Sequence, residues 1–456
     1  MAVGAGSYDG ARSIVEQATI VNSGRPRFWT RASAGLGADA PLAVVLLAMI
    51  GLGLFLRAYH LGVPAALKWD EHHYVETARS YLHHQYAWND HPPLSKLIIA
   101  AFMWALGDGP VVWRLPSLLF GLIDIALVAA LAGRLFASRR AAFIAAAFVA
   151  ADGFFIAYSR TALLDGMIVG FALAAMLCVL SGRTVWHALA AGVCVGCATS
   201  FKLNGLVFVA AATAACLCSR PLRRWTPVLL LSAALVFYAQ CAIALINVGR
   251  SGSIMSVIHE NRAMVQHHLS YTVVHPYSSH WYTWFAPLKP IFLRRDVGAD
   301  GSVHALLALG NPILWWAATA AIIAAAVVVI RTGPRRLWQQ LTDGAGSVPA
   351  PAVAADGAAP DNQAGLFFWV LAAWAGPIVF WIPSLRDSFI YHYMPSYAFA
   401  LPLLAGFVDR LYSRWRIPTL IAIVLIAEVT IIYAPLWGEL SISEAAMRAR
   451  LFPGWR

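Results

Sequence analysis

Two aspartates, Asp70 and Asp90, lie at the two ends of one short polar segment in a chain that carries few charges. Asp70, in the run Trp69-Asp70-Glu71, and Asp90 bracket one short polar segment. A positioned carboxylate can accept a proton from a hydroxyl group, or act as the partner of a cation or a sugar. The same residue type is common at the start of helices and turns, so Asp70 would cap a helix and Asp90 a turn. Spacing alone leaves both interpretations open.

A set of charged and aromatic residues lies in the short connections between apolar runs. It comprises Arg114, Arg160, Asp165, Lys202, Arg386, Tyr391, His392 and Tyr393. Arginine and lysine bind phosphate by charge and by hydrogen bonds, so several of them at one face predict an anion site. A lipid-linked phosphate fits such a site, because its tail requires the bilayer. For each residue alone, a long side chain snorkelling to the membrane interface is the alternative.

Short helices must position these residues. Between residues 71 and 86, apolar side chains recur at helical spacing, which predicts an amphipathic helix that lies on the membrane and begins directly after Asp70. Pro92 and Pro93 then fix an extended turn. The apolar run within 92–107 is too short to cross a bilayer and predicts an interfacial helix.

Composition places these helices in a membrane protein. Of 456 residues, 60% are hydrophobic and only 12% are charged, and the mean hydropathy is +0.66. Soluble domains carry roughly 25% charged residues, so a soluble enzyme, a disordered chain and a disulfide scaffold are excluded. The net charge of +11 comes from small arginine clusters between apolar runs. These clusters lack the contiguous basic face of a nucleic-acid-binding protein and are typical of topology-setting charge.

The apolar runs predict an all-α polytopic membrane protein with about eleven transmembrane helices. The predicted spans are 41–59, 114–134, 140–158, 163–181, 185–201, 203–219, 226–247, 308–330, 365–383, 395–412 and 417–436. If the arginines at 25, 27 and 31 are cytoplasmic, the short arginine-rich connections fall on the same side. We then expect a cytoplasmic N-terminal segment (1–40), external loops at 60–113 and 248–307, a cytoplasmic linker at 331–364, and an external tail at 437–456.

The second external loop is rich in aromatic residues around His275, Tyr277, Trp281 and Trp284. Such residues form membrane-interface belts, and they also stack on sugar rings. No His-Glu-x-x-His pattern occurs in the chain. A divalent metal stays open as a cofactor, with Asp70, Glu71 and Asp90 as its plausible ligands.

Taken in order, these motifs resemble a known family. The motifs are Trp69-Asp70-Glu71, Asp90-His91-Pro92-Pro93-Leu94, Arg114-Leu115-Pro116, Ser159-Arg160 to Leu164-Asp165, Ser200-Phe201-Lys202, His275-Pro276-Tyr277-Ser278-Ser279 and Tyr391-His392-Tyr393-Met394-Pro395. The set is similar to that of the protein O-mannosyltransferases, polyprenyl-phosphate-mannose-dependent enzymes of the GT-C membrane fold. The resemblance covers roughly residues 41–436 and favours a compact bacterial-type member.

The resemblance implies a role for each candidate residue. Asp70 would be the catalytic base, with Glu71 beside it in the catalytic pair. The residues implied for substrate binding are Asp90, His91, Arg114, Arg160, Asp165, Lys202, Tyr391 and His392. Among them, Arg114 and Lys202 would hold the phosphate, Arg160 and Asp165 would form a supporting pair, and His392 would lie near the donor.

The resemblance predicts an inverting glycosyltransferase in the bacterial inner membrane, with its active site on the periplasmic side. It would move a sugar, most simply mannose, from a polyprenyl-phosphate carrier to a Ser or Thr hydroxyl of exported proteins. One alternative is a transferase of the same fold that modifies a lipid or glycan acceptor, as the lipid A aminoarabinose transferases do. Another is a secondary transporter, for which charges and Pro or Gly breaks within spans are also typical.

Overall fold

The structure is a computed structural model that describes residues 28–270, 275–343, 362–384, 387–452 and 455, with side chains from residue 39 onward. Most of the predicted N-terminal segment 1–40, part of the linker 331–364, and Arg386 lie outside the described residues. The chain divides into a short unit, Met1–Val45, and a main unit, Leu46–Arg456. The site and its surroundings belong to the main unit.

The main unit is mostly helical. Its helices are α2 (Phe28–Ala58, which begins in the first unit), α3 (Glu71–Leu82), α4 (Leu94–Leu106), α5 (Pro110–Phe136), α6 (Arg139–Ala151), α7 (Gly153–Ser159), α8 (Asp165–Ser181), α9 (Val185–Phe201), α10 (Leu206–Cys218), α11 (Thr226–Asn247), α12 (Ile254–Ser270), α13 (Pro312–Thr332), α14 (Pro334–Thr342), α15 (Gln363–Trp381), α16 (Met394–Arg414), α17 (Arg416–Trp437) and α18 (Glu444–Ala449). Single 3₁₀ turns are η1 (Leu203–Gly205), η2 (Arg223–Trp225), η3 (Trp281–Thr283) and η5 (Ile390–Tyr393). A small antiparallel sheet has the order β1 (Ile291–Val297), β2 (Ser302–Ala308), β3 (Ile442–Ser443).

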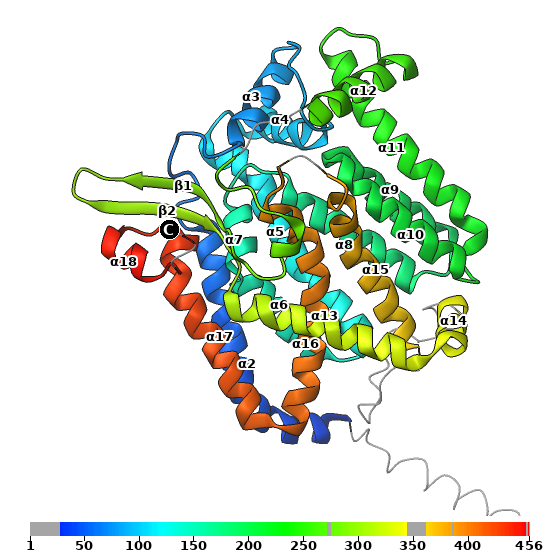
Figure 1. The fold of residues 1–456 in the computed structure, drawn as a ribbon, viewed down its shortest axis with the longest axis vertical. Helices are drawn as coiled ribbons and strands as arrows, with labels where there is room; N and C mark the ends of the chain where they lie inside the picture. Colours follow the sequence, from blue (N-terminus) through cyan, green and yellow to red (C-terminus); the bar gives the residue numbers. More distant parts are fainter. Residues whose placement is uncertain (1–27, 271–274, 344–361, 385–386, 453–454, 456) are drawn as a thin grey trace, which may run out of the picture. The chain divides into compact units, whose positions relative to one another are not determined.

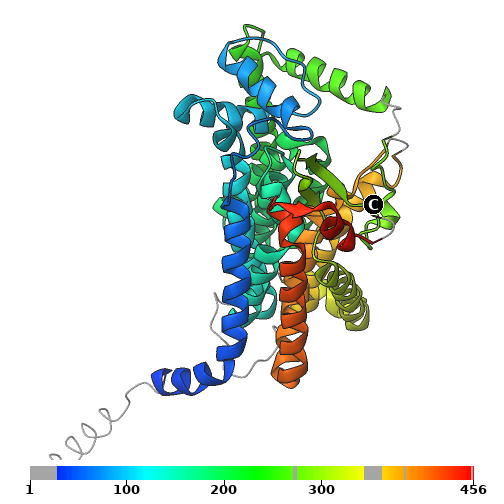
Figure 2. The ribbon, with the colours of Figure 1, turned by 90° about the vertical axis from the view of Figure 1, so that its left-hand side faces the viewer.

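Helix α16 is the centre of the bundle. It contacts α5, α6, α8, α13 and α15, and most of its side chains are buried. Helices α8, α9 and α11 pack against one another in sequence on one side. Helices α3, α4 and α12 lie over one end of the bundle, as the two views in Figure 1 and Figure 2 agree. The helices predicted near 71–86 and 92–107 are therefore present, as α3 and α4.

Each predicted span coincides largely with a helix, but their number stays a prediction. Among the described residues, six helices are long and apolar enough to cross a membrane, namely α2, α5, α11, α13, α15 and α17. A seventh arises if α6 and α7, bent by 61° at their junction, count as one span. Helices α8, α9 and the η1–α10 segment are shorter.

A buried polar residue shapes the bend between α6 and α7. Asp152 caps α7 by accepting a hydrogen bond from the Phe154 amide at 3.0 Å. It also accepts bonds from the Asn311 amide and from the Tyr397 hydroxyl, both at 2.9 Å. The following Gly153 lies so close to Trp437 that an added Cβ would sit 1.8 Å from the ring. The bend is therefore fixed by hydrogen bonds and by packing against α17.

The small sheet was not expected from the sequence. The predicted span at 308–330 begins later than expected, because Ala308 ends strand β2 and helix α13 starts at Pro312. Asn311 caps that helix by accepting bonds from the amides of Ile313 and Leu314. The sheet and α18 lie at one end of α17 (Figure 1). They share with α17 one hydrophobic cluster that includes Leu307, Trp437 and Trp455.

Candidate active site

Residues of three separate segments come together where α3 begins. Asp70 precedes α3, and the groups whose charges act on its carboxylate are His73, His72, Lys202 and His275. Lys202 follows α9, and His275 lies in the segment between α12 and η3. Asp70 and Lys202, which are far apart in the sequence, are thus near enough for their charges to interact.

Asp70 does not cap the helix that it precedes. It occupies the N-cap position of α3, yet its side chain makes no capping hydrogen bond. The residue is half-buried, and burial raises the pKa of its carboxyl above the usual range, although the nearby histidines and Lys202 partly offset this. A carboxylate of raised pKa is a better proton acceptor than an exposed aspartate.

The backbone around Asp70 is held in an unusual conformation. Trp69 has φ +41°, in the left-handed region that bulky side chains rarely adopt. Such a residue costs of order 1–3 kcal/mol and persists only when its surroundings impose it. The Trp69 ring contacts His275 and Tyr277, with ring centroids 5.5 and 5.8 Å away.

Glu71 and Arg114 bind each other in the interior. Two parallel bonds, Nε to Oε1 and Nη2 to Oε2, are both 2.9 Å long, and both side chains are fully buried. Arg114 also donates to the carbonyls of Leu61, Pro64 and Ala66, which uses all five of its N–H groups. Glu71 further accepts the amides of Lys68 and Ala162. This pair therefore holds the loop in shape, and all the N–H groups of Arg114 are used inside the protein.

Of the two predicted phosphate ligands, Lys202 is the one whose charge acts on Asp70. Its Nζ lies 3.5 Å from Oδ1 of Asp165 and 5.0 Å from the centroid of the Tyr391 ring. The backbone is extended at Lys202, between α9 and η1, which directs the chain across the end of the bundle. The cation, the acid and the phenol form one compact polar group beside Asp70.

Arg160 pairs differently from the expectation. Instead of joining Asp165, it donates to Glu439 at 3.2 Å and to the carbonyls of Leu56 and Tyr59 at the end of α2. A helix C-terminus presents unpaired carbonyl groups that favour a cation. Asp165 pairs with Lys202, so the predicted supporting pair is divided between two ion-pair groups.

Asp90 lies in a cluster of histidines that links α3 to α12. It accepts a bond from Trp88 Nε1 at 2.9 Å, and it lies 3.9 Å from His73 and 3.6 Å from His267. His91 stacks on His268 with centroids 5.1 Å apart. The charges of Asp90, Asp70 and Asp165 all act on the hydroxyl of Tyr74, whose pKa is raised well above its usual value, mainly by burial.

Tyr391 and His392 have different surroundings. The Tyr391 ring lies against Lys202, whereas His392 is buried and packs against Trp381, with ring centroids 3.9 Å apart and the planes tilted by 37°. The Nδ1 atom of His392 accepts the Phe389 amide at 3.0 Å. Of the two, Tyr391 is the one that borders the polar group.

The described residues show no metal site. Within these residues, no group of three or more His, Cys, Asp or Glu side chains is arranged to hold a metal ion. Both oxygens of Glu71 are bonded to Arg114, so Glu71 does not fit the set of ligands considered with Asp70 and Asp90.

Two residues, Glu439 and His275, make contacts that the sequence does not predict. Glu439 pairs with three cations, but in the sequence it is only one of two acids in the tail. The sequence indicates His275 only through its aromatic neighbours, whereas in the structure its amide donates to Asp387 at 2.6 Å and its ring lies near Trp69. For Glu439, the sequence shows only an acid that follows a glycine after a predicted span, and this pattern does not predict contacts with three cations.

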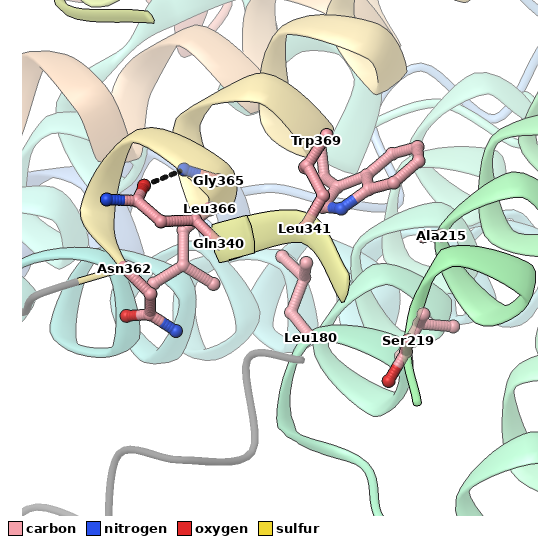
Figure 3. A pocket seen from close by; sticks show the side chains of 10 residues that line it. Leu180, Ala215, Ser219, Gln340, Leu341, Asn362, Gly365, Leu366 and Trp369 are labelled. Atoms are coloured by element: carbon pink, nitrogen blue, oxygen red, sulfur yellow. Dashed lines mark hydrogen bonds between the residues drawn. The ribbon is translucent and has the colours of Figure 1, made fainter. Parts of the chain in front are cut away.

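A separate pocket lies at the ends of α8, α10, α14 and α15 (Figure 3). It has room for only about 10 Å³ of solvent and is lined by Leu180, Ser219, Leu341, Asn362 and Trp369, among others. None of the predicted site residues lines it. This pocket is therefore distinct from the group around Asp70.

Three family models match the chain along most of its length. Residues 47–114 and 90–246 match models described as dolichyl-phosphate-mannose-protein mannosyltransferase. Residues 254–455 match the C-terminal four-transmembrane region of protein O-mannosyltransferase.

Relatives of known name agree with these matches. The polyprenol-phosphate-mannose–protein mannosyltransferase of Mycolicibacterium smegmatis is 27% identical over an alignment of 348 positions that covers 58% of this chain and 67% of that protein. The protein of the same name from Mycobacterium tuberculosis is 26% identical over 54% of this chain and 63% of its own length.

Solved structures show the fold. The Saccharomyces cerevisiae protein O-mannosyltransferase Pmt1-Pmt2 complex bound to the sugar donor superposes with a TM-score of 0.72 at 14% identity, covering 91% of this chain and 92% of that one. ArnT from Cupriavidus metallidurans bound to undecaprenyl phosphate gives a TM-score of 0.53 at 17% identity, covering 87% and 65%. The predicted GT-C fold of a multi-pass membrane protein is confirmed. The chain belongs to the protein O-mannosyltransferase family.

Proposed function

We propose that this protein is an inverting glycosyltransferase that moves mannose from a polyprenyl-phosphate carrier to a Ser or Thr hydroxyl of exported proteins. One observation carries the proposal: Asp70, half-buried and without a capping bond, lies within electrostatic reach of Lys202. Family membership and the names of the relatives support the reaction class. Family membership and the names of the relatives therefore favour a transferase over a transporter.

The reaction follows from this geometry. The acceptor oxygen forms a bond to the anomeric carbon while the bond from that carbon to the phosphate oxygen breaks, and its electron pair leaves with the polyprenyl phosphate. The hydroxyl proton passes to Asp70, whose raised pKa makes it a better proton acceptor than an exposed aspartate. Lys202, placed by Asp165 and Tyr391, faces the charge that grows on the leaving phosphate.

The other candidate residues act around these two in the proposal. Asp90 and His91 border the acceptor side, where α3 meets α12. Glu71, Arg114 and Arg160 shape the loop from the interior. We place the protein in a bacterial inner membrane with this face toward the periplasm, because a donor carried by a lipid needs no cytoplasmic nucleotide at the site.

The test is a transfer assay with the full-length protein in lipid nanodiscs. Polyprenyl-phosphate-mannose and a Ser/Thr peptide should give mannosylated peptide and free polyprenyl phosphate, detected by mass spectrometry. Asp70→Asn should abolish the product, whereas Asp108→Asn should retain it. Asp108 is the control because it is an exposed acid in the same loop whose carboxylate pairs with Arg79. Parallel reactions contain a lipid A or glycan acceptor. Transfer to these alone, with none to peptide, would overturn the proposal.

A further inference from the structure

The carboxylate of Glu439 binds three cations from three distant parts of the chain. Lys68 Nζ lies 2.7 Å from it, Arg160 Nη2 3.2 Å and Arg294 Nη1 3.1 Å. The side chains of Glu439, Lys68 and Arg160 are almost completely buried. A buried carboxylate among cations fixes the geometry of its partners, because loss of any one leaves an unpaired charge in the interior.

One of these cations lies two residues before Asp70. Lys68 donates from Nζ to Glu439 and to the Arg160 carbonyl, and its backbone amide donates to Glu71 Oε2 at 2.8 Å. The chain is therefore held on both sides of the Trp69-Asp70 dipeptide, at Lys68 by Glu439 and at Glu71 by Arg114. These contacts impose the left-handed conformation of Trp69.

Glu439 is itself held by the small sheet. Its φ is +56°, and its carbonyl oxygen lies 3.2 Å from His304 Nδ1 of β2. Arg294 reaches it from β1. The tail that follows α17 thus connects the sheet of the second external loop to the loop that carries Asp70.

We propose that Glu439 is a positioning residue for Asp70: through Lys68 it fixes the Trp69-Asp70 turn, so that the Asp70 carboxylate faces Lys202. The inference rests on the proposed function only for its kinetic consequence. The geometric part, that Glu439 determines the order of residues 66–73, stands without it.

The test compares Glu439→Gln with Glu444→Gln in full-length protein in nanodiscs. Glu444 is a matched control, because it lies in the same tail and pairs with Arg295, next to Arg294 on β1, at 2.7 Å and in a solvent-exposed position. Since a displacement of about 1 Å can cost about 100-fold in rate, Glu439→Gln should lower kcat roughly 10- to 100-fold with the donor KM within about twofold of wild type. Glu444→Gln should match wild type.

Conservative variants separate positioning from folding. Lys68→Arg retains the ion pair and should recover most of kcat, whereas Lys68→Met should match Glu439→Gln. The double variant Lys68→Met/Glu439→Gln should lose little more than either single one, because both break the same connection. An unchanged kcat in folded Glu439→Gln protein, or an equal loss in Glu444→Gln, would overturn the inference.

Hydrogen exchange gives a readout that does not depend on the reaction. Amide exchange at residues 66–73 should speed up in Glu439→Gln and in Lys68→Met but not in Glu444→Gln. If wild-type protein transfers no mannose but this pattern holds, the proposed function fails and the positioning role stands. If Glu439→Gln does not fold, the comparison of Lys68→Arg with Lys68→Met tests the positioning role instead. Equal amide exchange and equal kcat in these two variants would contradict that role.

Discussion

At the scale of single residues, the adjacent acids Asp70 and Glu71 have opposite surroundings. Glu71 is fully buried and accepts four hydrogen bonds, two of them from Arg114. Asp70 is half-buried and makes no capping bond. The helical turn that begins α3 directs the two carboxylates to different sides. One acid stabilises the loop, and the other is available for proton transfer.

Removing Arg114 should therefore destabilise the protein. Breaking a fully buried ion pair by deleting one partner costs about 3–5 kcal/mol, because the other charge stays buried and unpaired. Arg114→Ala should lower the thermal unfolding temperature strongly and Asp70→Asn only slightly, as measured by the loss of folded protein on heating. Equal unfolding temperatures for the two variants would contradict the division of roles between Asp70 and Glu71.

The rate of transfer should depend on the protonation of Asp70. The base acts as a carboxylate, so activity is lost as pH falls through its pKa and is full above it. Burial raises that pKa, and the acid limb of kcat/KM should thus lie above the usual range of an aspartate. Because Lys202 contributes to lowering the pKa of Asp70, Lys202→Met should move this limb to higher pH. A limb that stays in place, or moves to lower pH, would count against the contact.

At the scale of elements, the sequence predicts the helices but not the small sheet or the ion pairs that connect them. Periodic apolar residues after Asp70 and the short run after Pro93 predicted α3 and α4 correctly. Strand β1 alternates in burial only over its first four residues, and the buried end of β2 reads as the start of an apolar span, so the sheet gave no usable signal. Ion pairs such as Glu71–Arg114 and Glu439–Lys68 join positions far apart in the chain, which no local pattern specifies.

The junction of α6 and α7 offers a test of packing. Gly153→Ala would place a methyl group 1.8 Å from the Trp437 ring, and such overpacking costs typically 1–3 kcal/mol. Gly51→Ala in α2 meets nothing within 4 Å and replaces a helical glycine, so it should be neutral or stabilising by up to about 1 kcal/mol. Thermal unfolding of the two variants should differ in this direction. Equal unfolding temperatures would show that α17 does not pack here as described.

At the scale of the whole molecule, the two ends of the bundle differ in chemistry. One end carries Asp70, Lys202 and the small sheet. At the other end, the arginines of η2 lie near α14, where Arg220 pairs with Asp343 at 2.6 Å. Helix α11, with 22 residues, is long enough at 1.5 Å per residue to join the two ends across a bilayer. The fold and the family membership thus agree with a lipid-linked donor. We propose that it binds at the end that carries Asp70 and Lys202.

Sidedness is measurable with single cysteines in a cysteine-free background. Ser251→Cys lies just beyond α11, and Arg224→Cys lies just before it; both positions are exposed. A membrane-impermeant thiol reagent should label Ser251→Cys in intact cells and Arg224→Cys only after the inner membrane is opened. The reverse pattern would place Asp70 in the cytoplasm and contradict the proposed location.

The central claim is that Asp70 accepts the hydroxyl proton while Lys202 faces the departing phosphate. The most direct measurement is the single-turnover rate of mannose transfer by Asp70→Asn at saturating donor and peptide, with Asp108→Asn as control. Loss of a general base costs typically 10²–10⁴-fold, so the account predicts a loss of at least about 100-fold, with donor binding retained. Transfer by Asp70→Asn at more than about a tenth of the wild-type rate would contradict it.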